Sequence, residues 1–361
     1  MKNFSSWGIR VRADFERNYY SLWHNLKTTR LDIGDTADLP EERSEFYDVG
    51  LGTKCNAECP FCYVAASHGG EFWPEVSKVW KAWMSTFPED IIIDPREVKN
   101  GNDEVLKELF GRPEKGESMD VIGLRLIVAA NVKVGNPLIY TEKPFQIAIG
   151  STMEPTIHPE FTEFLKTVFE SKVVPNYTTN GITLAKDDCE ELLEATRNFC
   201  GGVAVSYGNK TLREYAKKAI LRLAKDGECK IMIHHLISDK ASVDEFVSLA
   251  KEYGKTLHYH VLLPLMVHGR SEEGMKDDGT FQYLAEQVDK EGIDNIALGA
   301  NFLPYLKKYP DLIKVWEYPS ELYSHNVLLK DKGVVITPSS YNLEPIKVIS
   351  EDDLHRNGKI L

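Results

Sequence analysis

Short apolar segments alternate with segments of helical periodicity through the second half of the chain, and this alternation limits the possible folds most strongly. The apolar segments predict strands at Gln146–Gly150, Val173–Thr179, Gly202–Tyr207, Cys229–His235, Leu257–Leu263 and Asn295–Leu298. The segments between them predict helices at Pro159–Ser171, Lys186–Asn198, Leu212–Lys225, Ser242–Tyr253 and Phe281–Glu291. Because strands separated by single helices pair in parallel, we expect an α/β fold with a parallel sheet.

A further strand is expected at Phe46–Leu51, which is compatible with an α/β barrel or a doubly wound sheet. The first unit lacks a nucleotide-type glycine fingerprint, and this disfavours a dinucleotide-binding fold. Alternate positions in several strands are polar or small, for example Asp48 with Gly50 and Ala204 with Ser206. A barrel with a polar, partly open lumen explains this pattern better than a closed barrel filled with aliphatic side chains.

The strand at Leu257–Leu263 has an apolar face, which we expect to pack on the helices, and a face with two histidines. The apolar face includes Tyr259 and Val261, so the histidines are expected in the lumen. The candidates for substrate contact in this strand and the loop after it are His258, His260, His268 and Arg270.

The rest of the chain is expected to extend or interrupt this barrel. The predicted N-terminal extension, barrel and C-terminal extension occupy residues 1–45, 46–300 and 301–361. An amphipathic helix is expected at Asp14–Leu26, and aromatic residues of this region are expected to pack on the main domain. Residues 88–144 are interpreted as a partly helical insertion, with helices at Asp103–Phe110 and Met119–Val132. A β-hairpin is expected within Asn326–Thr337.

The composition is that of a globular protein of 361 residues, with 42% hydrophobic and 27% charged residues. No apolar run approaches the roughly 20 residues of a membrane span, and the first 20 residues lack the apolar segment of a signal peptide. A cytoplasmic location is therefore expected. The net charge of −12 argues against non-specific binding to nucleic acids, which requires a basic surface.

Three of the six cysteines lie within eight positions, in a loop after the first predicted strand. In a cytoplasmic protein, Cys55, Cys59 and Cys62 indicate a metal centre rather than disulfides. Three thiolates suit a [4Fe–4S] cluster in which one iron has no protein ligand. Structural zinc is the alternative, but it requires a fourth ligand such as His68. The remaining cysteines are expected to be ordinary buried residues, namely Cys189, Cys200 and Cys229.

The loop Cys55-x3-Cys59-x-Phe61-Cys62 resembles the signature of the radical S-adenosylmethionine (radical SAM) superfamily. Ile147–Phe161, which contains Glu154-Pro155, is similar to the second-strand motif of that family, and Tyr177–Gly181 resembles its third-strand ending. The resemblance covers roughly two thirds of the chain. It implies a partial (β/α)6 barrel with extensions, in which the C-terminal hairpin resembles a cysteine-free remnant of a SPASM/twitch-like extension.

The resemblance implies that the three loop cysteines hold a [4Fe–4S] cluster and that S-adenosylmethionine chelates the open iron. The residues that it implies for cofactor binding are Phe61, Thr152, Glu154, Asn180, Ser206 and Leu265. Glu154 would receive the cofactor ammonium group, although Glu154-Pro155 alone is equally compatible with a helix cap. Thr152-Met153 replaces the usual Gly-Gly of the motif, and Met153 is expected to narrow the pocket or shift the cofactor.

The implied reaction is reductive cleavage of S-adenosylmethionine to methionine and a 5′-deoxyadenosyl radical, which abstracts hydrogen from a substrate. An external one-electron reductant such as flavodoxin or ferredoxin is implied as a partner. The C-terminal extension favours a peptide or protein substrate, and a nucleotide or small metabolite is the alternative. A third hypothesis, a non-catalytic iron–sulfur protein, does not explain Glu154, because a cluster carrier needs no site for the cofactor ammonium.

Overall fold

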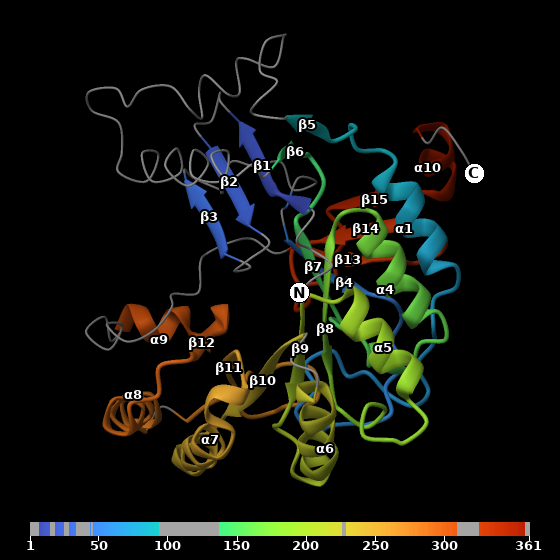
Figure 1. Ribbon diagram of the computed structural model, residues 1–361. Helices are drawn as coiled ribbons and strands as arrows, with labels where there is room; N and C mark the ends of the chain where they lie inside the picture. Colours follow the sequence, from blue (N-terminus) through green and yellow to red (C-terminus); the bar gives the residue numbers. More distant parts are fainter. Residues whose placement is uncertain are drawn as a thin grey trace, which may run out of the picture.

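A sheet of ten strands organises the structure, a computed structural model shown in Figure 1. The strand order is β12-β11-β10-β9-β8-β7-β4-β13-β14-β15, with β12 and β15 at the two edges. The structure describes residues 7–14, 19–24, 29–33, 44, 46–93, 137–225, 229–276, 278–308 and 325–357.

Seven consecutive strands of this sheet, from β12 to β4 in the strand order, pair in parallel, and they are the seven that the sequence predicts. Their bounds are β4 (Phe46–Gly50), β7 (Gln146–Ile149), β8 (Val174–Thr179), β9 (Gly202–Ser206), β10 (Lys230–Ile237), β11 (Tyr259–Pro264) and β12 (Ile296–Leu298). The expected α/β fold with a partial, open barrel is therefore confirmed.

Helices cover the outer side of this sheet (Figure 1). They are α1 (Val76–Met84), α4 (Phe161–Glu170), α5 (Glu190–Phe199), α6 (Arg213–Ala224), α7 (Lys240–Tyr253) and α8 (Thr280–Glu291). Each presents an apolar stripe, such as Val243, Phe246 and Val247 of α7, to alternate strand residues. The apolar core therefore lies between the sheet and its helices, and the opposite face of the strands is free to line a lumen.

The C-terminal segment adds strands to the barrel sheet. It contains α9 (Leu303–Lys308), β13 (His325–Leu328), β14 (Val334–Thr337), β15 (Lys347–Ile349) and α10 (Glu351–Asn357). The predicted hairpin is present as antiparallel β13 and β14. In addition, β13 pairs in parallel with β4, so that Asn326 lies beside Asp48. The hairpin thus continues the sheet on the other side of the strand that precedes the cysteine loop.

A second sheet of five strands has the order β3-β2-β1-β6-β5. Its strands are β1 (Ile9–Asp14), β2 (Tyr19–His24), β3 (Thr29–Ile33), β5 (Ile91–Ile93) and β6 (Leu138–Tyr140). The predicted helix at Asp14–Leu26 is wrong, because β1 and β2 pair antiparallel with Ile9 opposite His24. Aromatic residues favour strands when a partner strand is available. The helices predicted at Asp103–Phe110 and Met119–Val132 lie outside the described residues.

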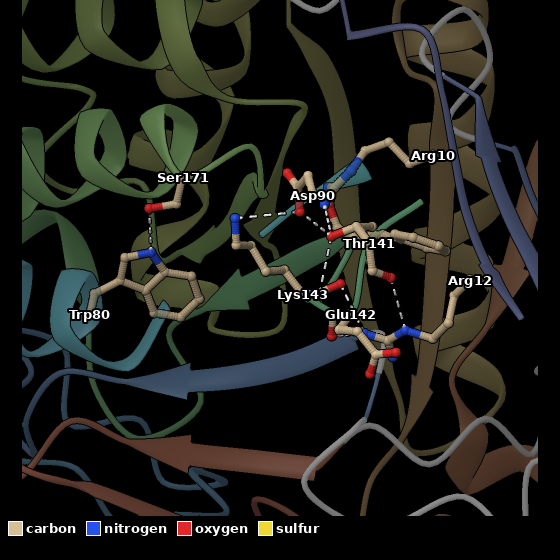
Figure 2. Close-up of polar contacts among 9 residues, drawn as sticks. Arg10, Arg12, Trp80, Asp90, Thr141, Glu142, Lys143 and Ser171 are labelled. Carbon is tan, nitrogen blue, oxygen red and sulfur yellow. Dashed lines mark hydrogen bonds and ion pairs between the residues drawn. The ribbon is translucent and has the colours of Figure 1, made fainter. Parts of the chain in front are cut away.

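A buried polar cluster joins the second sheet to the segment that enters β7 (Figure 2). The Arg10 guanidinium donates to the Phe145 carbonyl over 3.3 Å and to Thr141 Oγ1 over 3.4 Å. Thr141 Oγ1 in turn donates to Asp90 over 2.7 Å, and Lys143 lies 3.4 Å from the same carboxylate. Burial lowers the pKa of Arg10 to about 10. These contacts link β1 and β6 to the barrel through hydrogen bonds.

Aromatic packing strengthens the same junction. Trp7 and Trp23 are buried in a small cluster with Phe145 and Val174. The ring of Trp7 also lies 5.0 Å from that of Phe169 on α4. The expectation that N-terminal aromatic residues pack on the main domain is therefore confirmed for these two tryptophans.

Candidate functional site

Cys55, Cys59 and Cys62 lie in the loop between β4 and α1, at the carboxyl ends of the parallel strands. Two backbone hydrogen bonds hold the base of this loop, from Thr53 to Glu71 and from Cys55 to Ser67, each 2.9 Å long. The three thiols are free and partly exposed. The loop therefore presents three sulfur ligands on the side of the sheet where the strands end.

Arg270 fixes the shape of the cysteine loop. Its guanidinium donates to the carbonyls of Cys59, Ala65 and Ala66 over 3.1, 3.0 and 2.5 Å. Its backbone N–H donates to the Cys62 carbonyl over 3.0 Å. The approach requires Gly269 before it, because a Cβ atom there would lie 2.3 Å from the Cys62 carbonyl oxygen. Arg270 therefore supports the shape of the loop, and its expected contact with substrate stays a prediction.

Glu154 is buried beside the cysteine loop, with 4% of its surface exposed. Its Oε1 accepts hydrogen bonds from Thr156 Oγ1 and Thr179 Oγ1, over 2.5 and 2.7 Å. Its Oε2 accepts from the Asn180 backbone N–H over 2.8 Å. The carboxylate also caps the short helix η4 (Pro155–Ile157), so the cap interpretation of Glu154-Pro155 is confirmed. Because Oε2 accepts this one hydrogen bond among the described residues, it keeps a lone pair for a further donor.

Two other predicted cofactor residues support the loop through their side chains. Asn180 Nδ2 donates to Asn56 Oδ1 over 2.7 Å, which ties the end of β8 to the cysteine loop. Thr152 is buried, and its hydroxyl donates to the Gly52 carbonyl over 2.7 Å. Met153 is buried and belongs to the main hydrophobic core. That it narrows the pocket or shifts the cofactor stays a prediction.

The electrostatic surroundings of these groups are dominated by burial. Burial raises the pKa of the Cys55 and Cys59 thiols. At Cys59, a hydrogen bond from Asn209 opposes this increase. Burial also raises the pKa of Glu154, and the hydrogen bonds from Thr156 and Asn180 lower it. A cation bound nearby would favour the charged forms of all three groups.

Phe61 and Leu265 line one cavity of about 210 Å³ at the carboxyl ends of β9, β10 and β11. The other residues that line its apolar part are Tyr207, Gly208, Leu236, Phe246 and Leu249. A Cβ atom at Gly208 would lie 3.2 Å from the Phe61 ring, so the small residue leaves room for this ring. The structure thus brings together the two residues that the resemblance implies for the adenine site.

The lumen side of the strands carries Asp48, Ser206 and His234. Ser206 and His234 are register partners on β9 and β10, so both side chains lie on the same face. Burial raises the pKa of Asp48 to about 7 and lowers that of His234 to about 4. Sequence reasoning placed Asp48 and Ser206 on this face but missed His234, although the alternation in Lys230–Ile237 predicts it.

The predicted faces of β11 are wrong. His260 is fully buried, and its Nδ1 atom lies 3.0 Å from His235 Nε2. Its ring packs against Phe246 of α7, on the helix-covered face. His258 precedes the first residue of β11 and is exposed at the amino end of the strand, opposite the cysteine loop. The structure therefore places neither histidine in the lumen near the carboxyl ends.

His268 is exposed near the cysteine loop, where its ring lies 5.5 Å from that of Tyr341. Tyr341 comes from the segment after β14 and packs 4.8 Å from Tyr63, the residue after Cys62. Its hydroxyl accepts a hydrogen bond from Asn301 over 2.6 Å. The C-terminal segment thus contributes Tyr341 to the mouth of the lumen, and no pattern in the sequence indicated this residue.

The three thiols of the cysteine loop could in principle bind a single metal ion or a cluster. Within the described ranges, no three His, Cys, Asp or Glu side chains converge closely enough to hold one ion. His68, the fourth ligand of the zinc alternative, pairs with Glu58 over 3.2 Å. Three separate thiols on one loop suit a cluster, in which each thiolate binds a different iron. The residues present therefore fit a [4Fe–4S] group better than zinc.

The three buried cysteines outside the loop agree with expectation. Cys189, Cys200 and Cys229 are buried and free.

Among the helices in the described part of the chain, none is both long and apolar enough to span a bilayer.

Three solved structures of SuiB from Streptococcus suis are similar to this chain, with TM-scores of 0.50 to 0.51 and identities of 12 to 14%. One contains S-adenosylmethionine and another the precursor peptide SuiA. The similarity covers 82% of this chain and 60% of the SuiB chain, so this chain spans less than two thirds of SuiB. No protein-family model matches the chain, and neither does any curated protein. The matched part of the chain therefore has the same fold as SuiB.

Proposed function

We propose that the chain is a radical SAM enzyme whose Cys55, Cys59 and Cys62 hold a [4Fe–4S] cluster. The observation that carries this proposal is the position of the three free thiols, which lie beside buried Glu154 at the carboxyl ends of the sheet. The backbone N–H of Glu154 donates to the Lys54 carbonyl over 3.1 Å, so this carboxylate is attached to the cysteine loop. Besides capping η4, a buried carboxylate beside three thiols could accept a hydrogen bond from a cationic ligand bound next to the loop.

When bound, the cluster would supply one electron for the cleavage of S-adenosylmethionine to methionine and a 5′-deoxyadenosyl radical, which abstracts hydrogen from the substrate. The residues of this chain would bind and orient the cofactor. Glu154 Oε2 would accept from the cofactor ammonium, and Phe61 with Leu265 would contact adenine in the 210 Å³ cavity. Ser206 would reach the ribose from the lumen face of β9. Asn180 and Thr152 would keep the loop in place rather than bind the cofactor through their side chains.

The substrate would enter the lumen, whose wall combines small residues with a few polar side chains. Ala148 and Ala204 are small residues on the lumen face, whereas at Gly50 the side chains of Thr152 and Leu328 fill the space. Asp48 and His234 are titratable groups on that face and could position a substrate or accept a proton. We propose a peptide or protein substrate, supported by the fold likeness to SuiB, for which a structure with a precursor peptide exists. Flavodoxin or ferredoxin would supply the electron, and the cytoplasm would be the location.

The proposal is tested by anaerobic reconstitution with iron and sulfide, followed by dithionite and S-adenosylmethionine. The expected product is 5′-deoxyadenosine, and Cys59→Ala is expected to reduce iron content and abolish this product because one ligand is lost. Cys189→Ser is the matched control, since this buried cysteine lies at the start of α5, away from the loop. The control should keep iron and product at the level of the unmodified chain.

The outcomes separate the hypotheses. An intact cluster without 5′-deoxyadenosine would leave only a non-catalytic iron–sulfur protein. Equal loss of iron in Cys59→Ala and Cys189→Ser would contradict the ligand assignment. Transfer of deuterium from labelled peptides, compared with labelled nucleosides and small metabolites, would identify the substrate class.

A further inference from the structure

Asn209 donates a hydrogen bond from Nδ2 to the sulfur of Cys59, with a distance of 3.1 Å. Asn209 lies in the loop after β9, and it is distant in sequence from the cysteine loop. In the proposed function, Cys59 is a cluster ligand. The contact therefore places a side-chain N–H group against a ligand sulfur.

The orientation of the Asn209 amide follows from its other contacts. Its Oδ1 accepts from the Thr211 N–H over 3.0 Å and from Thr211 Oγ1 over 2.7 Å. The backbone N–H can only donate, so the oxygen of the amide must face Thr211. The NH₂ group must then face Cys59. The same contacts make Asn209 the cap of the short helix η5 (Lys210–Leu212), which holds the side chain in place.

The three loop thiols differ in their surroundings. Cys55 receives backbone N–H groups of Ala57 and Glu58, which move with the loop itself. Cys59 receives a donor from Asn209 in the loop after β9, where Asn209 is held as the cap of η5. A donor on a rigid neighbouring element keeps its position when the loop relaxes, so its electrostatic influence on the sulfur is constant.

We propose that Asn209 is a positioning residue that raises the reduction potential of the cluster through its hydrogen bond to the Cys59 sulfur, an inference that rests on the proposed function. Reduction adds one negative charge to the cluster and its thiolates. A donor to a ligand sulfur stabilises that charge, and hydrogen bonds to the sulfurs are among the factors that set the potentials of iron–sulfur clusters. The external reductant would then need to be less strongly reducing.

Two substitutions isolate this hydrogen bond. Asn209→Ser keeps an oxygen that can cap Lys210–Leu212 but is too short to reach the sulfur. Asn209→Asp keeps the cap and the shape, but it places a carboxylate oxygen where the N–H group was. The reconstituted protein is titrated with dithionite at pH 8, and its midpoint potential is followed by electron paramagnetic resonance.

Asn209→Ser is expected to disfavour one-electron reduction by about threefold to tenfold, where a tenfold change equals about 59 mV for a one-electron couple. Asn209→Asp is expected to lower the potential further, because an anion faces the sulfur. Asn198→Asp is the matched control for the added charge, since it lies in the last turn of α5, at the opposite end of the strands. Its potential should equal that of the unmodified protein.

The outcomes distinguish this inference from the proposed function. If both Asn209 variants have a full cluster signal and an unchanged midpoint potential, Asn209 is only a structural cap. A lower potential in Asn198→Asp of the same size as in Asn209→Asp would assign the effect to net charge and overturn the proposal. Failure of the unmodified protein to form a [4Fe–4S] signal would instead overturn the proposed function on which the inference rests.

Discussion

His234 and His235 are consecutive residues of β10, yet they lie in opposite environments. His234 points to the lumen beside Ser206, whereas His235 packs on the helix side against Phe246. His235 is hydrogen-bonded to His260, and a second nitrogen of His260 is buried without a hydrogen-bond partner among the described residues. One residue of register thus places His234 on the lumen face and His235 on the helix side, where it also lines the 210 Å³ cavity.

The difference shows that burial and lowered pKa values do not by themselves identify a functional histidine. Burial lowers the pKa of His234 and His260 to about 4 in each case. What distinguishes them is the face: one borders the open lumen and the other a packed aromatic cluster. The side of the sheet on which a histidine lies is therefore the more informative criterion for choosing candidate residues. Substitutions on the two sides of the sheet test this criterion.

The largest expected effect comes from the helix-covered face. Phe246→Ala should lower the free energy of unfolding by about 3–5 kcal/mol, because it removes a buried ring that contacts both core histidines. His234→Leu, on the lumen face, should change it by no more than about 1 kcal/mol. Urea denaturation of the two variants measures the contrast. Equal losses of stability would mean that the two faces do not differ as described.

Acid should weaken the fold through the core histidines. Burial first, and the nearby His260 second, lower the pKa of His235, and burial lowers that of His260. Histidine in the unfolded chain has a pKa near 6.5 and therefore binds a proton as the pH falls below that value. In the folded chain, His260 binds a proton only near pH 4. This contribution to stability is complete above pH 6.5 and is lost as the pH falls towards 4.

The expected size of this loss is on the order of a few kcal/mol, measured by urea denaturation between pH 7.5 and pH 4.5. The double variant His235→Leu with His260→Leu should show a shallower dependence, because both proton-rejecting sites are removed. Some dependence should remain, since the pKa of His234 is also lowered. If the double variant shows the same pH dependence of stability as the unmodified chain, groups other than His235 and His260 cause the acid sensitivity.

The smallest expected effect concerns the cysteine loop. Arg270→Lys keeps the charge but loses the planar fork that contacts three carbonyls, so the loop should lose on the order of 1 kcal/mol of local stability. Amide hydrogen exchange at Cys55 and Cys62 should become about fivefold faster. The matched control is Arg222→Lys, whose guanidinium contacts the Leu184 and Lys186 carbonyls of another loop. Faster exchange of the cysteine loop in the control would show a global rather than a local effect.

The strands of the barrel could be predicted because buried parallel strands leave a clear alternation in the sequence. The N-terminal hairpin could not, because Asp14–Leu26 contains apolar residues at spacings that also fit a helix, and the pairing of β1 with β6 depends on a strand more than 100 residues away. The faces of β11 were predicted wrongly because Tyr259 and Val261 are apolar but line the lumen. In addition, His260 is buried in the core, where it forms a hydrogen bond with His235.

The candidate site was predictable to the extent that it depends on side-chain chemistry. The cysteines and Glu154 carry recognisable chemistry at recognisable spacings. The roles of Arg270 and Asn209 depend on partners that come together only in the folded chain, a set of carbonyl groups and one sulfur. Backbone acceptors have no signature in the sequence, because every residue has one.

The pairing of β13 with β4 has a consequence for how the protein is made. β4 and the cysteine loop leave the ribosome early, and one edge of β4 remains without its partner until His325–Leu328 has been synthesised. At about 5–20 residues per second, this delay is on the order of tens of seconds. An unpaired strand edge can pair with other chains during that time. Conditions that slow translation of the C-terminal third should therefore increase aggregation of the nascent chain.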